Sequence, residues 1–290
     1  MLFRSKYGSP YFFLHRADLH AAIASVVPAE LVQLNRKLAG FEQNASGVTL
    51  IFSDHAREQA DCLIAADGVH SLVREQLLGP EKAQFTGKVA YRTTFDVTRM
   101  ANVNVPQHRT KWWGKDRHMV IYPVTADRSE IYFVTSQPEP AEWRTAESWS
   151  AKGDIDELKA SFAGFHAEVQ AVLNAAASVH KWALFERDPL PSWSADRVTL
   201  LGDACHPMTP YMAQGAASAL EDAMVLSRCL ADVPREGIAP ALKRYEATRK
   251  PRTSQIQGQS SKNTWLKGET DPSWVYGYDA RSAPLAEQVN

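Results

Sequence analysis

Two segments of the chain share one pattern: an apolar stretch, a turn of Asp and Gly, and then a stretch that favours a helix. The first, ADCLIAADGVHSLVRE, contains Asp67 and Gly68, and the second, RVTLLGDACHPMTPYMAQGAASALEDA, contains Gly202 and Asp203. Open α/β sheets bind ligands at the carboxyl ends of their buried strands. One such turn alone favours turn formation and helix capping, but two of them favour a ligand site.

The second segment also predicts where a helix begins. Two prolines in its loop lead to an expected helix start near Gly215. The first turn of a helix has free backbone N–H groups and a positive dipole end, which suit an anion or a partly negative carbonyl. Gly215 has no side chain, so a flat ligand can approach the backbone closely.

The N-terminal third predicts a mixture of helix and strand. Apolar spacing predicts a short amphipathic helix over 16–27, with Leu19, Ile23 and Val26 on one face. Strands are expected over 48–52 and 60–66, the second being covered on both faces because it is almost continuously apolar. Ser71 is expected to cap a following helix.

From about Lys88 to Gln137 the chain is rich in β-branched and aromatic residues, which predicts a mostly antiparallel sheet. Helical spacing returns over 154–178, followed by a strand over 197–201. The helix after Gly215 is expected to place several apolar residues near one face: Ala216, Leu220, Ala223, Met224 and Leu230. A long polar helix over 239–266 should break or bend near Pro251.

This order predicts a mixed α/β fold, with a substrate-type sheet inserted into a nucleotide-type α/β domain. The balance of 32 basic against 33 acidic residues argues against nucleic acid or an acidic membrane as the main partner. Apolar runs are too short for a membrane span. Three cysteines without disulfide or metal spacing are typical of a reducing cytoplasm, where we expect this protein.

The two turn segments and the early Arg16-Ala17-Asp18-Leu19 resemble the FAD-dependent aromatic hydroxylases, the p-hydroxybenzoate hydroxylase-like group A flavoprotein monooxygenases. KWWGKDRHMVIYPV, EIYFVT, RDPLPSW and NTWLKGETDPSWVYGYD narrow the resemblance to the 6-hydroxynicotinate 3-monooxygenase subfamily. The resemblance implies a partial Rossmann-like FAD-binding domain over 1–84 and 190–266. It also implies a substrate-binding β-sheet domain over 85–189 and a C-terminal segment over 267–290.

The resemblance also implies roles for single residues. Arg16 matches an arginine close to FAD. Asp67 and Gly68 match a motif that contacts both FAD and the reduced nicotinamide cofactor, NADH or NADPH. Asp203 matches the aspartate that hydrogen-bonds the FAD ribose, and the stretch from Pro210 through Gly215 to Ala216 matches the loop beside the isoalloxazine. The N–H groups of Gly215 and Ala216 would stabilise negative charge on reduced flavin.

The chain departs from the family in two respects. It contains no G-x-G-x-x-G turn for the FAD pyrophosphate, and its Met1 falls within the family fold. Roughly ninety residues of the family pattern are lacking, more than one βαβ unit of about 30. We therefore expect a truncated or abnormally short product with an exposed sheet edge, poor solubility and weak FAD binding. The second departure is Tyr211, which stands where that subfamily has a histidine.

Three residues are candidates for catalysis. His118 and Tyr122 are expected on one face of a strand, where the resemblance implies contact with the substrate. An ordinary sheet contact is an equal alternative for His118, whereas at Tyr122 the substrate role is slightly favoured. Tyr211 is the third. The implied reaction uses O2 and a flavin C4a-hydroperoxide to convert 6-hydroxynicotinate, a small aromatic acid, into 2,5-dihydroxypyridine and CO2. A salicylate-like phenolic-acid hydroxylase, or an inactive fragment without stable FAD, stays open as an alternative. His206 and Cys205 are expected to be structural, with no metal.

Overall fold

The computed structural model describes residues 3–100, 109–139, 151–265 and 268–287. They form two compact units, Met1–Val32 with Phe85–Phe185 and Gln33–Gln84 with Glu186–Asn290. Within the described ranges, no helix combines the length and the apolar character needed to cross a membrane.

The first unit is built on a six-stranded sheet in the order β6-β7-β8-β5-β10-β9. Its strands are β5 (Gln84–Asp96), β6 (Thr110–Trp113), β7 (His118–Pro123), β8 (Glu130–Pro138), β9 (Lys152–Gly153) and β10 (Val179–Glu186). Its helices are α1 (Phe3–Tyr7), α2 (Arg16–Ala24), α4 (Ile155–Ser161) and α5 (Ala167–Ala175). The pairs β6·β7, β7·β8 and β5·β8 are antiparallel, which confirms the sheet expected over 88–137.

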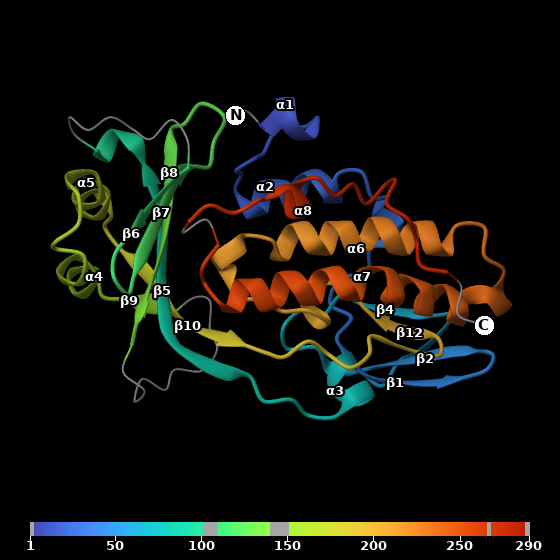
Figure 1. The fold of residues 1–290 in the computed structure, drawn as a ribbon. Coiled ribbons are helices and arrows are strands. Elements are labelled where there is room, and N and C mark those ends of the chain that lie inside the picture. The colour runs from blue at the N-terminus through green and yellow to red at the C-terminus, as the bar shows by residue number, and fades with distance from the viewer. Residues whose placement is uncertain (1–2, 101–108, 140–150, 266–267, 288–290) are drawn as a thin grey trace. The chain divides into compact units, whose positions relative to one another are not determined.

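One face of this sheet is the core of the first unit. Helices α4 and α5 cover it (Figure 1), and their Leu158 and Val172 pack with Met119 and Ile121 of β7. All four side chains are fully buried. The alternate residues of β6 and β7 therefore point to the opposite face, which is polar and aromatic.

The second unit holds two three-stranded sheets, β1-β2-β3 and β11-β12-β4. Its strands are β1 (Leu38–Asn44), β2 (Gly47–Phe52), β3 (Arg57–Ala60), β4 (Leu63–Ala65), β11 (Ser194–Ala195) and β12 (Val198–Leu200). Its helices are α3 (Leu72–Leu78), α6 (Gly215–Leu230), α7 (Ile238–Ser261) and α8 (Ser273–Tyr276). The pair β12·β4 is parallel.

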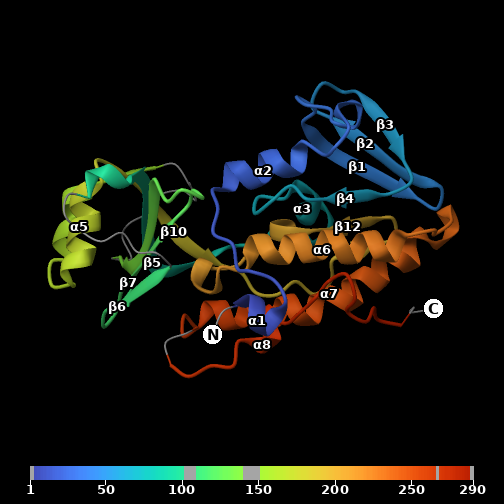
Figure 2. The same cartoon turned by 90° about the horizontal axis from the view of Figure 1, so that it is seen from above.

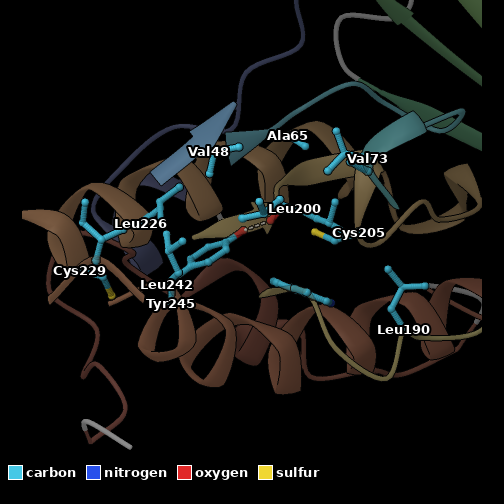
Figure 3. Close-up of a cluster of buried hydrophobic side chains, with 14 of the residues drawn as sticks. Val48, Ala65, Val73, Leu190, Leu200, Cys205, Leu226, Cys229, Leu242 and Tyr245 are labelled. Atoms are coloured by element: carbon cyan, nitrogen blue, oxygen red, sulfur yellow. Dashed lines mark hydrogen bonds between the residues drawn. The ribbon is translucent and has the colours of Figure 1, made fainter. Parts of the chain in front are cut away.

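The core of the second unit joins its strands to α6 and α7. Leu200, Leu226 and Leu242 lie in one buried cluster (Figure 3), and the Tyr245 hydroxyl donates to the Leu200 carbonyl at 3.2 Å. A smaller cluster places Trp265, just before the C-terminal segment, and Val275 of that segment against Met212 and Ile256. The C-terminal segment therefore covers part of α7 and the loop that precedes α6, as Figure 2 shows for α7 and α8.

Most predicted elements are present, but several expectations need correction. The helix expected over 16–27 ends at Ala24 and buries none of its residues; Ile23 is 44% exposed. Ser25, Val26 and Val27 leave the helix because Pro28 follows them and disfavours helical backbone before it. The helix expected over 154–178 is two helices, and the expected break at Pro251 does not occur, since α7 is continuous through it.

The single strand expected over 60–66 is also wrong. β3 ends at Ala60 and β4 begins at Leu63, because the chain leaves one sheet there and joins the other, with Leu63 N–H donating to the Arg197 carbonyl. Nor is β4 covered on both faces: Ile64 is 40% exposed, and within the described ranges β4 is an edge strand.

The expected core face of α6 is also wrong at four of its five residues; Leu230 alone among them packs against the core. Leu220 is 48% exposed, and Ala216, Ala223 and Met224 are exposed as well. The buried face contains Ser218, Asp222, Val225 and Cys229. Hydropathy ranks Asp222 as a surface residue, but its buried carboxylate is fully paired, as described below.

Candidate functional site

The two turn segments meet at one edge of the second unit. β4 and β12 are parallel neighbours, with Ala65 opposite Leu200, and Leu201 N–H donates to the Ala65 carbonyl at 2.9 Å. Asp67 follows the end of β4, and Asp203 follows the end of β12. The prediction that both turns belong to one site on neighbouring strands is consistent with this geometry.

Arg74 of α3 connects the two loops. Its Nη2 donates to the Val69 carbonyl at 2.6 Å, and its Nη1 donates to the Ala204 carbonyl at 2.9 Å. A carboxylate oxygen of Glu81 lies 3.3 Å from Arg74 Nε. Burial lowers the pKa of Arg74, while Glu81 acts in the opposite direction. The guanidinium fixes the distance between the loops, because its planar set of donors reaches carbonyls on both sides.

The loop that carries Asp203 rests on a buried charged cluster. Asp222 of α6 accepts from His206 Nε2 at 2.5 Å, from Arg249 Nε at 2.8 Å and from the Gly202 N–H at 3.2 Å. Burial acts to raise the pKa of Asp222, but the hydrogen bonds and charges of His206 and Arg249 hold it below its usual value. Asp222 is therefore an anion that anchors the turn before Asp203.

Gly202 is required by its surroundings. Its φ of +63° is left-handed, and a Cβ there would lie 3.1 Å from the Cβ of Ala219 in α6. A side chain would be strained by the backbone conformation and would press against α6. The close approach of the loop to α6 therefore requires a glycine at the position before Asp203.

Asp203 lies beside the start of α6. A Cβ on Gly215 would lie 3.9 Å from Asp203 Oδ1. Asp203 is exposed, and in the ranges that the structure describes no group hydrogen-bonds its carboxylate. α6 begins at Gly215 as expected, and no side chain caps its N-terminus. An unpaired carboxylate and free helix N–H groups therefore lie together at the surface.

The other residues of the two loops have mixed roles. The Asp67 carboxylate accepts from Val73 N–H at 3.2 Å, so it supports α3, and Ser71 caps that helix as expected. Gly68 has a φ of +79°. Pro210 begins a short 3₁₀ turn in which Tyr211 is buried, and Ala216 is exposed in the first turn of α6.

The remaining candidates belong to the first unit. His118 and Tyr122 lie four residues apart on β7 and share the face opposite the core. Burial, Lys111 and Lys88 lower the pKa of His118 to about 3, and burial with Tyr132 raises that of Tyr122. His118 is therefore neutral and Tyr122 protonated near neutral pH. Arg16 begins α2 and is exposed.

Cys205 and His206 behave as structural residues. The ligand atoms of Cys205, His206 and Asp222 lie within 4.8 Å of one another, a spacing that a metal would require. However, His206 and Arg249 already hydrogen-bond the Asp222 carboxylate, and the Cys205 thiol donates to the Gly202 carbonyl. Burial raises the pKa of Cys205, so it is a protonated thiol.

Sequence reasoning missed the residues that support the loops: Arg74, Asp222 and Arg249. Each is charged and each is buried. Asp222 had a usable signal, since Ser218, Asp222, Val225 and Cys229 follow helical spacing with an acid in the middle. Arg74 and Arg249 gave none, because charged residues on polar helices are normally exposed.

Comparisons with known proteins agree with this architecture. Residues 19–260 match the FAD binding domain family. The chain is 45% identical over 284 residues to 6-hydroxynicotinate 3-monooxygenase of Bordetella bronchiseptica, covering 98% of this chain and 73% of that protein. The structure of a salicylate hydroxylase substrate complex matches with a TM-score of 0.81 at 28% identity, covering 92% and 73% of the two chains. Klebsiella pneumoniae HpxO, complexed with FAD and uric acid, matches with a TM-score of 0.78 at 29% identity, covering 94% and 68%.

The chain belongs to the FAD binding domain family. Its fold and the site formed by the loops of Asp67 and Asp203, called the edge site below, agree with this. Within that family, the chain is an FAD-dependent aromatic monooxygenase of the salicylate hydroxylase family. The mixed α/β class and the resemblance read from the sequence are thereby confirmed. The edge site fits FAD, because a sugar hydroxyl suits the unpaired Asp203 carboxylate and a flavin carbonyl suits the free N–H groups of α6.

Proposed function

We propose that the protein catalyses the decarboxylative hydroxylation of 6-hydroxynicotinate with NADH or NADPH and O2. The 6-hydroxynicotinate anion, reduced nicotinamide, O2 and two protons give 2,5-dihydroxypyridine, CO2, oxidised nicotinamide and water. A C–O bond forms at the ring carbon that bears the carboxylate, the C–C bond to the carboxylate breaks, and its electron pair returns to the ring. The second atom of O2 leaves as water.

The second unit supplies the cofactor site in this proposal. Asp203 would hold the ribose of FAD, and the N–H groups of Gly215 and Ala216 would stabilise negative charge on the reduced ring. Asp67 and Gly68 would lie along FAD and the nicotinamide, and Arg16 and Pro210 would lie beside the flavin. When bound, FAD supplies hydride acceptance from the nicotinamide and activation of O2.

The sheet of the first unit supplies the substrate face. His118 is neutral and Tyr122 is protonated, so each offers a hydrogen bond without a charge of its own. Tyr122 would bind the ring oxygen and His118 would orient the ring. We assign Tyr211, which is buried in the loop before α6, to the same reaction. In terms of the chain, residues 1–84 and 190–266 would bind FAD, 85–189 would bind substrate, and 267–290 would form the C-terminal segment.

The observation that carries the proposal is the 45% identity to a 6-hydroxynicotinate 3-monooxygenase over almost the whole chain. Tyr211 favours one alternative, since a tyrosine in place of a histidine changes which ring substituents the site would hydrogen-bond. That alternative is a salicylate-like phenolic-acid hydroxylase. The structural similarity to a salicylate hydroxylase supports keeping it.

The test begins with a visible absorption spectrum of the purified chain after incubation with FAD and desalting. Retained flavin bands support a functional cofactor site, whereas a colourless protein would mean that this polypeptide does not hold FAD by itself. The flavin-loaded protein is then incubated with NADH and with either 6-hydroxynicotinate or salicylate, and products are separated by chromatography. We expect 2,5-dihydroxypyridine with one equivalent of CO2, while turnover of salicylate alone would establish the alternative.

A further inference from the structure

The polar face of the first unit's sheet is positively charged: Lys88 and Arg92 of β5 share it with Lys111 of β6 and with Arg109, and the last two are neighbours. β6 and β7 pair with Trp113 opposite His118 and Lys111 opposite Val120, so these side chains share one face. Tyr122 lies two residues further along β7 on the same face. Arg109 precedes β6 with the spacing of two that places it beside Lys111.

The positive charges of Arg109 and Lys111 lie against aromatic rings. Lys111 Nζ lies 4.0 Å from the centre of the Trp113 ring, and the Arg109 guanidinium lies 5.8 Å and 5.7 Å from the rings of Tyr11 and Phe13. In the ranges that the structure describes, no carboxylate pairs with Lys111 or Arg109. Burial and Arg109 lower the pKa of Lys111 to about 8, which reflects the cost of holding like charges together away from water.

Aromatic rings surround these charges. The rings of Trp113 and His118 lie 4.9 Å apart, and the ring of Tyr122 lies 5.0 Å from those of Phe13 and Tyr132. A planar ring can stack or pack edge-on against such groups. The face thus combines flat apolar walls, neutral hydrogen-bonding groups and unpaired positive charge, which matches an aromatic ring with one carboxylate.

We propose that Lys111, with Arg109 beside it, binds the carboxylate of the aromatic acid and thereby selects acids over neutral ring compounds. The inference rests on the proposed function, because it names the residues that recognise that substrate. A carboxylate would pair with Lys111 and offset the repulsion from Arg109. Lys115 differs, since it is exposed in the turn between β6 and β7 and gains nothing from an anion on this face.

The test measures binding by isothermal titration calorimetry on the full chain incubated with FAD. The probes are 6-hydroxynicotinate and its uncharged analogue 6-hydroxynicotinamide. We expect the wild type to bind the acid at least tenfold more tightly than the amide. Lys111→Met should weaken acid binding at least tenfold and leave amide binding within about twofold, while Lys115→Met should change neither.

The amide serves as the folding control, because a distorted face would bind it poorly too. Lys111→Arg keeps the charge and should retain most of the preference for the acid. Equal binding of acid and amide by the wild type, or equal losses for both in Lys111→Met, would overturn the inference. Lys111-dependent acid binding without formation of 2,5-dihydroxypyridine would support the inference and refute the proposed reaction, and binding of neither probe would refute both.

Discussion

Two charged side chains, Asp222 of the second unit and Lys111 of the first, have opposite surroundings. Asp222 of the second unit is paired with Arg249 and His206, so its charge is compensated within the protein. Lys111 of the first unit has Arg109 as its charged neighbour and no acidic partner in the ranges that the structure describes. Paired charges fix the backbone of a loop, whereas an unpaired charge on an accessible face indicates a ligand of opposite sign.

The largest effect is expected from Asp222→Ala, which breaks the paired cluster. The substitution leaves Arg249 buried with one partner fewer and removes the anchor of the Gly202 N–H, which should destabilise the protein by about 3–5 kcal/mol. Urea unfolding followed by circular dichroism measures the change. Asp279→Ala, at an exposed acid of the C-terminal segment, is the control. A loss below about 1 kcal/mol would show that the cluster does not anchor the loop.

A smaller loss is expected from Arg74→Met, which keeps the length of the side chain but removes the link between the loops. The Val69 and Ala204 carbonyls each lose a hydrogen bond, and we expect the two losses to destabilise the protein by about 1–3 kcal/mol together. We expect lower stability together with weaker FAD retention after desalting, because both loops border the flavin site that we propose. Unchanged FAD retention in a destabilised variant would separate Arg74 from the cofactor site.

Asp203→Asn tests an exposed aspartate against the buried Asp222, because Asp203 lies in the loop that Asp222 anchors but is accessible to solvent. Stability should stay within about 0.5 kcal/mol of wild type, as is usual for a surface substitution. FAD affinity should fall about tenfold, the loss expected for one hydrogen bond to a charged group. Equilibrium dialysis against FAD measures it, with Asp196→Asn, at another exposed aspartate in a turn, as the matched control. Equal FAD affinity in both variants would contradict the ribose assignment.

The smallest effect is expected for the pH dependence of acid binding at Lys111. His118 is neutral above about pH 3, the pKa values of Tyr122 and Tyr132 are raised, and the other basic groups of this face are Lys88, Arg92 and Arg109. Lys111 therefore loses its proton as pH rises through about 8, and acid binding should weaken by up to about tenfold between pH 7 and 9. Lys111→Arg should remove this decline in a calorimetric pH series. A decline of equal size in that variant would assign it to another group.

The sequence predicted most elements of the fold because local patterns specify them. Alternating β-branched and aromatic residues gave the sheet of the first unit, and helical spacing gave α6 beginning at Gly215. The prediction from the sequence failed where contacts between distant segments determine the structure. The strand expected over 60–66 is split because Leu63 pairs with β12 far along the chain, and α6 buries Asp222 rather than Leu220 because Arg249 of α7 neutralises it.

The same division holds for the candidate site. The turns with Asp67 and Asp203 could be found in the sequence, because an Asp-Gly pair after an apolar stretch has a local signature. Arg74 could not, since its role is to join carbonyls 5 and 130 positions away in the chain. The positive charge of Arg109 and Lys111 is visible in the sequence, but the lack of an acidic partner is not.

The sequence by itself determined the class of elements, the two strand-end turns and the membership of the family, because short-range patterns and motifs carry that information. Only the tertiary structure decided which charges are compensated and which remain available to a ligand. The physical reason is that the energy of a charge depends on its burial and on the groups within a few ångströms, and folding brings those groups from distant parts of the chain.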